Sequence, residues 1–363
     1  MKKIKEIKDA LNKKYYERER EIEGLLVSML SKQHILFIGE AGTGKSMLSS
    51  ELGNIIQGSN YFQWLLSQFS TPEELFGVLS LKDLEKGIYK RNTTGKLPES
   101  HFAFLDEIFK ANSAILNSLL TIINERLFYN NGSPVKTSLM SIVGSSNEYP
   151  EEGEGLEALF DRFLLRYEVD YVKEEQSFVS LLKGENKVEI PTITIQELEQ
   201  YQQETQQVRI PDNIIDTLSE IRQALSDEGV RPSDRRFVQS LNILKAKAYV
   251  EQRTNVIRRD IEILKNSLWV NPEKKDLVQD IVQYHSVDQN EIILEERTKE
   301  VEDLSKLLKE KNDVSEQMEI INKLKKIREE VVDLQLSEED LKTNLLDKIT
   351  NEINNFANAI LDF

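Results

Sequence analysis

A short segment, Gly39-Glu40-Ala41-Gly42-Thr43-Gly44-Lys45-Ser46, has the residue types and spacing of a loop that holds phosphate groups. Its glycines let backbone N–H groups curl around an anion, and a helix beginning at its end adds positive potential. Lys45 is then placed to contact the β- and γ-phosphates, and the Ser46 hydroxyl to bind Mg²⁺. The segment therefore predicts a site for ATP with Mg²⁺; a strand-to-helix turn without a ligand is the weaker interpretation.

Two adjacent carboxylates, Asp106 and Glu107, follow the apolar run Phe102 to Leu105. A buried strand has little reason to end in paired acids unless a cation or a proton transfer uses them. Asp106 is expected to organise Mg²⁺ and Glu107 to polarise the attacking water. In isolation the pair reads as an ordinary solvated strand end, and the phosphate loop upstream favours the catalytic interpretation.

Three further polar positions are candidates for the same chemistry. Asn147 ends the next strand, where it can orient a water, although an Asn after a strand is usually a turn residue. Arg162 follows a helical stretch and can stabilise charge on a neighbouring subunit's ATP, although a lone Asp-Arg pair such as Asp161-Arg162 is more often a surface ion pair. Ser233 begins a helix with Arg235 and Arg236 in its first turn. One of these arginines can reach the phosphates of its own subunit, or the segment is an ordinary solvated helix start; spacing decides neither this nor which arginine acts.

The elements that must position these residues follow from apolar periodicity. Residues 1–170 mix short apolar runs with amphipathic helical stretches, which predicts an α/β domain around a parallel sheet. Residues 171–285 lose the strand-like runs and predict an all-α lid domain. Residues 286–363 are charged and helical. The expected strands are His34 to Ile38, Tyr61 to Leu66, Phe102 to Leu105, Leu139 to Val143 and Leu164 to Val169.

The last region has apolar residues three and four apart, which is typical of coiled-coil-like or bundled helices. Ser337 is expected to cap the final helix. The pattern favours a bundle within one chain over a coil between chains. The apolar series are Ile320, Leu324, Ile327, Val331 and Leu334, and then Leu346, Ile349, Ile353, Phe356 and Ile360.

Composition excludes several classes of function. The chain of 363 residues exceeds one compact domain, and its net charge of −16 disfavours broad nucleic-acid binding. Without cysteine, and with three scattered histidines, it lacks thiolate chemistry and a His-based zinc site. No apolar run predicts a membrane span or a signal peptide. The expected location is the cytoplasm.

The order of motifs resembles the AAA+ ATPases and, within them, the MoxR family, with the RavA branch the most similar. The likeness runs nearly continuously from about residue 14 to 255. Beside the phosphate loop it rests on Tyr16-Glu17-Arg18-Glu19, Ser70-Thr71-Pro72-Glu73-Glu74-Leu75-Phe76-Gly77, Gly95-Lys96-Leu97-Pro98, Phe104-Leu105-Asp106-Glu107-Ile108-Phe109-Lys110-Ala111, Ile122-Ile123-Asn124-Glu125-Arg126, Ser146-Asn147-Glu148-Tyr149-Pro150, Leu159-Phe160-Asp161-Arg162-Phe163 and Ser233-Asp234-Arg235-Arg236.

By this resemblance Lys45 and Ser46 belong to the Walker A motif, and Asp106 and Glu107 to Walker B. Asn147 corresponds to sensor 1, Arg162 to the arginine finger and Arg235 to sensor 2. The resemblance also implies a homo-oligomeric ring, typically a hexamer, with hairpin insertions at residues 75–97 and 127–137; Asn131-Gly132 suits the turn of the second.

The implied activity is ATP-driven remodelling of a protein client, often with a von Willebrand factor A domain partner. Two departures stand out: Gly44 replaces the Ala that MoxR relatives often have, and residues after about 285 do not match the strand-containing insertion of RavA. One alternative is a motor acting with nucleic acid or a nuclease, through Lys82, Lys86, Lys90, Arg91, Lys96 and Lys136. A third hypothesis, a nucleotide-switched scaffold with little turnover, is disfavoured by Glu107 and Asn147.

Overall fold

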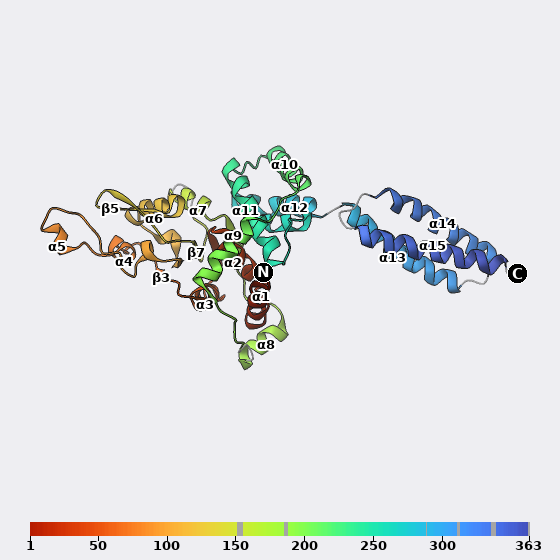
Figure 1. Cartoon of the computed structure of the whole chain (residues 1–363), viewed down its shortest axis with the longest axis horizontal. Coiled ribbons are helices and arrows are strands. Elements are labelled where there is room, and N and C mark those ends of the chain that lie inside the picture. Colours follow the sequence, from red (N-terminus) through yellow and green to blue (C-terminus); the bar gives the residue numbers. More distant parts are fainter. Residues whose placement is uncertain (151–154, 185–187, 288, 311–312, 335–338, 362–363) are drawn as a thin grey trace. The chain divides into compact units, whose positions relative to one another are not determined.

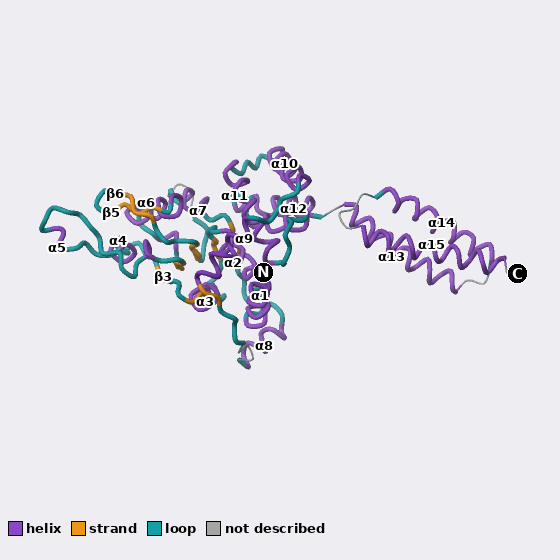
Figure 2. Tube along the Cα trace, viewed as in Figure 1, coloured by secondary structure: helices purple, strands orange, loops and turns teal. Residues whose placement is uncertain are grey.

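The computed structural model covers the whole chain and describes all residues except 151–154, 185–187, 288, 311–312, 335–338 and 362–363. The chain divides into two compact units, Met1–Gln283 and Tyr284–Phe363. Figure 1 shows the elements of each unit, and Figure 2 separates helices from strands and loops.

A five-stranded sheet forms the centre of the first unit, in the order β3-β4-β7-β1-β8, with every neighbouring pair parallel. The expected α/β architecture with a parallel sheet is confirmed, and each expected strand is present within a few residues. The strands of this sheet are β1 (Ile35–Ile38), β3 (Tyr61–Leu65), β4 (Phe102–Asp106), β7 (Ser141–Ser146) and β8 (Leu165–Glu168). A short parallel pair joins β2 (Ile56–Gln57) to β9 (Ile193–Thr194).

Helices surround the sheet and form the lid. Up to residue 206 they are α1 (Lys2–Lys14), α2 (Glu19–Ser31), α3 (Lys45–Ile55), α4 (Pro72–Phe76), α5 (Leu81–Leu84), α6 (Ser113–Glu125), α7 (Glu157–Arg162), α8 (Glu175–Lys183) and α9 (Ile195–Gln206). The rest of this part has α10 (Asp212–Asp227), α11 (Asp234–Val250) and α12 (Lys275–Ser286), with 3₁₀ turns η1 (Leu97–Glu99), η2 (Ile108–Lys110), η3 (Arg258–Asn266) and η4 (Pro272–Lys274).

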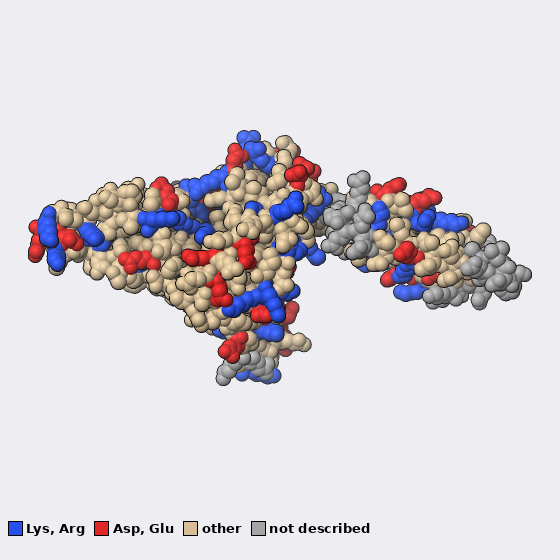
Figure 3. Space-filling view, viewed as in Figure 1, with Lys and Arg blue, Asp and Glu red and all other residues tan. Residues whose placement is uncertain are grey.

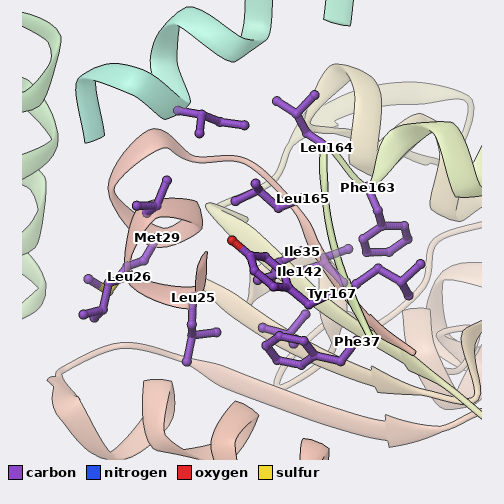
Figure 4. Close-up of a cluster of buried hydrophobic side chains, with 14 of the residues drawn as sticks. Leu25, Leu26, Met29, Ile35, Phe37, Ile142, Phe163, Leu164, Leu165 and Tyr167 are labelled. Atoms are coloured by element: carbon purple, nitrogen blue, oxygen red, sulfur yellow. The ribbon is translucent and has the colours of Figure 1, made fainter. Parts of the chain in front are cut away.

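The packing of α2 against the sheet explains why the central strands are apolar throughout. All four residues of β1 are buried, because β1 has strands on both edges and helices over its faces. Leu25 and Met29 of α2 lie over this part of the sheet together with Tyr167 (Figure 4). A Cβ at Gly24 would lie 2.5 Å from the Tyr167 ring, so the close approach of α2 requires glycine.

The lid docks on the sheet domain through helix contacts between segments distant in sequence. Helix α11 packs against α2 and η3, and α9 packs against both α2 and α11. The side chain of Ser233 accepts a hydrogen bond from the Arg236 N–H at 3.3 Å, so it caps α11 as the sequence predicts. The sheet domain and the lid share one continuous apolar core.

Two insertions lie together, and we call them the arm: residues 77–96, and the hairpin of β5 (Leu127–Asn130) and β6 (Ser133–Lys136). The predicted second hairpin is confirmed, with positive φ at both Asn131 and Gly132. The two halves of the first insertion meet at one antiparallel bridge, Leu79↔Arg91. The Ser80 N–H donates to the Lys90 carbonyl and the Asn92 N–H to the Val78 carbonyl, both at 2.8 Å, so the chain reverses as the resemblance implies but without regular strands. Helix α5 lies between the two halves, and the Ser80 hydroxyl caps it by accepting from the Asp83 N–H at 3.3 Å.

The second unit contains α13 (Gln289–Glu310), α14 (Val314–Asp333) and α15 (Glu339–Leu361). Each helix contacts the other two, and they enclose an apolar core of their own. The favoured arrangement, a bundle within one chain, is therefore found. Leu324 and Val331 are fully buried in it, as the periodicity predicts. The predicted capping residue Ser337 and the side chain of Ile360 lie outside the described residues.

Candidate nucleotide site and arginine pocket

The phosphate loop joins β1 to α3 as its sequence predicts. Gly42 and Gly44 have φ of 84° and 89°, a left-handed backbone that favours glycine. A Cβ at Gly39 would lie 2.1 Å from the Val169 carbonyl oxygen, so that position also needs glycine. Gly44 precedes α3 without a side-chain cap, which leaves the first N–H groups of the helix available to an anion.

Lys45 lies in the concave side of this loop and is only 7% exposed. Its ammonium donates hydrogen bonds to the carbonyl oxygens of Gly39 and Glu40, the latter at 2.8 Å, and to Asn147 Oδ1 at 3.2 Å. Burial lowers the pKa of Lys45, while the nearby carboxylates raise it. The ammonium is therefore held inside the loop, where it can contact a phosphate that the loop binds.

The two Walker B carboxylates have different partners. Asp106 accepts hydrogen bonds from the Ser145 hydroxyl and from the Glu107 N–H, the latter at 3.2 Å. Glu107 has a left-handed backbone (φ 52°) just after β4, and its carboxylate accepts from Asn147 Nδ2 at 2.5 Å and lies 3.2 Å from Lys110 Nζ. Asn147 thus connects the phosphate-loop lysine to the carboxylate that is expected to polarise water.

Sheet order explains why these residues meet. Strand β7 lies between β1 and β4, and the carboxyl ends of parallel strands share one edge of the sheet. Asn147 follows β7, so it falls between the loop after β1 and the acids after β4. The sequence predicted each residue separately, and the strand order brings them together.

The polar groups here fit Mg²⁺ that is bound mainly by phosphates. Ser46 is exposed in the first turn of α3, and Asp106 is half-buried at the same edge of the sheet. In the part of the chain that the structure describes, no three His, Asp or Glu side chains gather to hold a metal by themselves. One hydroxyl and one carboxylate are what a Mg²⁺ site completed by phosphates and water needs.

An apolar pocket of about 450 Å³ adjoins the phosphate loop. The loop contributes Gly42, Thr43 and Gly44 to it, and the remaining walls are mainly aromatic and aliphatic. Stacking on such a surface suits a nucleobase. The walls are Lys14, Tyr15, Tyr16, Arg18, Met47, Tyr171, Val172, Phe178 and Leu181. Sequence reasoning identified none of these walls as site residues; Tyr16 and Arg18 entered it only through a motif that carries the family resemblance.

Glu17 and Arg18 form hydrogen bonds that hold together the segments around this pocket. The buried Arg18 guanidinium donates to the carbonyl oxygens of Thr43, at 3.1 Å, and Asp170. The Glu17 carboxylate accepts from the backbone N–H groups of Lys173 and Glu174, at 2.8 and 2.9 Å, just before α8. The segment before α2 thus connects the phosphate loop to the chain that follows β8.

The candidate arginines lie at a separate small pocket, of about 80 Å³. Arg162 and Arg235 both line it, and Arg235 Nη2 lies 3.5 Å from Asn124 Oδ1. The described residues that line this pocket include none from the phosphate loop, so the prediction that Arg235 reaches the phosphates of its own chain gains no support here and stays a prediction. Lys32, His34, Arg126, Asp161 and Arg236 are among the other walls.

Arg235 and Arg236 have different environments. Arg235 is exposed, whereas Arg236 is 2% exposed and bound to Asp161. Only Arg235 can therefore contact a ligand from solvent. At the floor of the same pocket, Arg126 Nη1 lies 2.5 Å from Nε2 of the buried His34, whose Nδ1 accepts from the Ile142 N–H at 2.9 Å. Burial, aided by the Arg126 charge, holds the pKa of His34 well below its ordinary value.

The sheet, the edge where Lys45, Glu107 and Asn147 meet, and the helical lid together define an AAA+ ATPase. The chain belongs to the MoxR family of this class: residues 2–209 match the MoxR domain of MoxR-vWA-beta-propeller ternary systems, and residues 213–282 match an AAA lid domain.

Relatives agree with this assignment. The chain is 37% identical to protein MJ0079 of Methanocaldococcus jannaschii over 100% of this chain and 98% of that one. It is 25% identical to the chaperone MoxR1 of Mycobacterium tuberculosis, over 43% of this chain and 41% of the relative. A solved candidate ATPase from Cytophaga hutchinsonii has the same fold, with a TM-score of 0.64 and 19% identity, over 79% of this chain and 94% of that one.

Proposed function

We propose that the chain hydrolyses ATP to ADP and phosphate with Mg²⁺ at the edge of the sheet after β1, β4 and β7. Lys45 and the loop amides hold the phosphates, and Ser46 and Asp106 hold Mg²⁺. Glu107 takes the proton of the attacking water, and Asn147 orients Glu107. The observation that carries this proposal is the position of Asn147, bonded to Lys45 at 3.2 Å and to Glu107 at 2.5 Å.

We propose further that the site is completed by a second copy of the chain, in a ring that is expected to be a hexamer. Arg162 and Arg235 share a pocket from which the phosphate loop of their own chain is absent. Two exposed or half-exposed arginines that line one pocket can bind an anion, and a phosphate bound to the neighbouring subunit can supply it. In this arrangement both arginines act on the neighbour's ATP.

The work done by hydrolysis is proposed to be remodelling of a protein client, with a von Willebrand factor A domain protein as partner. The family model is named for such systems, and one relative is a chaperone. The arm offers a surface for a protein: Val78, Leu81, Tyr89, Tyr129 and Val135 are each at least half exposed. Hydrogen bonds from the Tyr89 and Arg91 N–H groups to Asn131 and Asn130 side chains join its two parts.

The nucleic-acid alternative has less support from the arm. Arg91 forms an ion pair with Glu73 at 2.9 Å, and Lys96 donates to the Glu74 carbonyl at 2.9 Å, so two of the six basic residues are engaged internally. Figure 3 shows basic and acidic side chains together at the tip that carries α5. A mixed surface of this kind suits a protein better than a polyanion.

Two finer assignments also remain proposals. The kinship with the RavA branch rests on the motifs shared from about residue 14 to 255, and the cytoplasm is the proposed location. Among the helices that the structure describes, none is both long and apolar enough to cross a bilayer.

Capture of a partner by the full-length Glu107→Gln chain tests the proposed function. Loaded with Mg²⁺ and ATP, this variant is expected to retain a von Willebrand factor A domain protein, because binding persists while turnover stops. The control is Lys45→Ala, which loses the phosphate contact and should retain nothing. Equal capture by both variants would show that the interaction does not depend on ATP and would contradict the proposal.

A further inference from the structure

The carboxylate next to the candidate arginine finger is engaged by the lid. Asp161 and Arg162 are the last two residues of α7. Asp161 Oδ1 accepts a hydrogen bond from Arg236 Nη2 at 2.7 Å, and the Asp161 carbonyl oxygen accepts from the same nitrogen at 2.7 Å. The end of α7 is therefore bound by both its side chain and its backbone to the first turn of α11.

Arg236 is fixed by more than this ion pair. Its Nη1 donates to the carbonyl oxygens of Ser267, at 2.7 Å, and Leu164, at 3.4 Å. Ser267 follows η3 in the lid, and Leu164 precedes β8 in the sheet domain. One buried guanidinium thus bonds to the lid, to the sheet domain and to α7 at once, so a shift of α11 must move or break the contact with Asp161.

A second buried arginine reinforces the same junction. The Arg166 guanidinium lies 4.4 Å from the ring centroid of Phe160, on α7, and 4.6 Å from that of Trp269, in the lid. Phe160 and Trp269 also contact each other, with ring centroids 5.7 Å apart. Helix α7, which ends at Arg162, therefore packs through Phe160 against Arg166 and against Trp269 of the lid. The position of α7 thus depends on the position of the lid.

Arg162, unlike Asp161, is not bonded to Arg236, although its charge acts on the neighbouring Asp161 carboxylate. It forms no hydrogen bond or ion pair with any residue that the structure describes, and its Nε is buried without a partner. The nearest carboxylate in sequence is that of Asp161, and its Oδ1 accepts a hydrogen bond from Arg236. The positive charge of Arg162 is consequently available to an anion outside the chain.

We propose that the Asp161–Arg236 pair is a latch through which the lid positions Arg162 for the ATP of the neighbouring subunit. Arg236 is a positioning residue and touches no substrate. Lid movement on one chain thereby changes catalysis at the next chain's site. The inference rests on the proposed function, since it requires that Arg162 acts on a neighbour.

Mixing two inactive full-length chains tests the latch, with phosphate release as the readout. A Lys45→Ala chain cannot bind ATP productively but presents Arg162, whereas an Arg162→Ala chain binds ATP but presents no finger. Their mixture should regain activity at one kind of interface. Asp161→Asn is then added to either chain: on the Lys45→Ala chain it should lower the regained turnover about tenfold or more, because misplacement by about 1 Å costs up to about a hundredfold.

The same substitution on the Arg162→Ala chain should leave the regained turnover within about twofold, since that chain presents no finger to misplace. Retained activity in this placement also shows that Asp161→Asn folds. Asp161→Glu on the Lys45→Ala chain should restore most of the turnover. The matched control is Asp234→Asn, which removes the exposed ion pair with Arg222 at 2.9 Å near the same end of α11 and should have no effect in either chain.

Each remaining outcome overturns an identifiable step. Equal loss in both placements, or loss in neither, refutes the latch while leaving the trans site intact. A parent mixture that regains no activity at any ratio refutes the trans arginine of the proposed function, and the latch fails with it. Arg236→Lys, which keeps the charge but loses the forked contact, should reproduce the directional loss.

Discussion

Replacing Glu107 with Gln is the sharpest perturbation of the proposed chemistry. The amide has nearly the same shape as the carboxylate, and its oxygen can still accept the hydrogen bond that Asn147 donates at 2.5 Å. Glu107 Oε2 now lies 3.2 Å from the Lys110 ammonium, and in the variant an NH₂ group takes the place of this oxygen. Lys110 is exposed, so its side chain can move away from that group. The change therefore removes basicity with little change of geometry.

The size of the effect follows from what is removed. A positioned general base contributes about 10²- to 10⁴-fold to a rate, which is about 2.7–5.5 kcal/mol of activation free energy. Nothing that holds ATP is altered, because Lys45, the loop glycines and the pocket of Tyr16 and Tyr171 lie elsewhere. Turnover should fall by at least about a hundredfold while the dissociation constant of Mg²⁺-ATP changes by less than about threefold.

Phosphate release in steady state and equilibrium binding of a fluorescent ATP analogue measure the two quantities separately. Glu148→Gln is the matched control, since Glu148 is an exposed acid one residue after Asn147. That variant should keep its turnover. If Glu107→Gln retained turnover within about threefold of the parent chain, Glu107 would not be the base and the assignment of this edge of the sheet would be refuted.

Three other measurements follow from the structure. Because burial lowers the pKa of His34, the unfolded chain takes up a proton below its ordinary pKa of 6.5 that the folded chain does not, so stability is lost as pH falls. Unfolding in urea should therefore show a larger loss of stability between pH 7.5 and 5.5 than in His34→Gln, and an equal loss would contradict this. Phe178→Ala should raise the KM for ATP about fivefold with kcat nearly unchanged, because Phe178 lines the apolar pocket beside the phosphate loop. An unchanged KM would show that Phe178 does not contact the nucleobase. Leu324→Asp places a charge in the core of the C-terminal bundle and should unfold it, which circular dichroism would detect as a loss of helix. Turnover should stay within about twofold of the parent chain, because the two apolar cores are separate. A loss of turnover would show that the bundle has a role in catalysis.

The catalytic edge could be predicted from sequence because its signals are local. Continuous apolar runs mark buried parallel strands, so β1, β4 and β7 were evident, and the residues that follow them carry the chemistry. The loop conformation at Gly42 and Gly44 is likewise encoded in the residues themselves. These features need only the rule that parallel strands present their carboxyl ends on one edge.

Features that depend on docking between distant segments were not predictable. Arg235 and Arg236 are adjacent in sequence. Only the contacts of the start of α11 with Asp161, Leu164 and Ser267 decide that Arg236 is buried and Arg235 exposed. The pocket beside the phosphate loop combines residues before α2 with residues after β8, and α8 shows no buried face that periodicity could reveal. In residues 75–97 the short helix α5, which lies between the two halves joined at Leu79 and Arg91, was not predicted.

The central claim is that the site is completed by a neighbouring chain, and a mixture of Lys45→Ala and Arg162→Ala chains tests it most directly. Each alone should release almost no phosphate, since one lacks the phosphate contact and the other the arginine finger. Mixed in equal amounts, they should release phosphate far faster than either, because an arginine in trans is worth about 10³–10⁵ in kcat. A mixture no faster than the sum of its parts, at any ratio, would contradict the account.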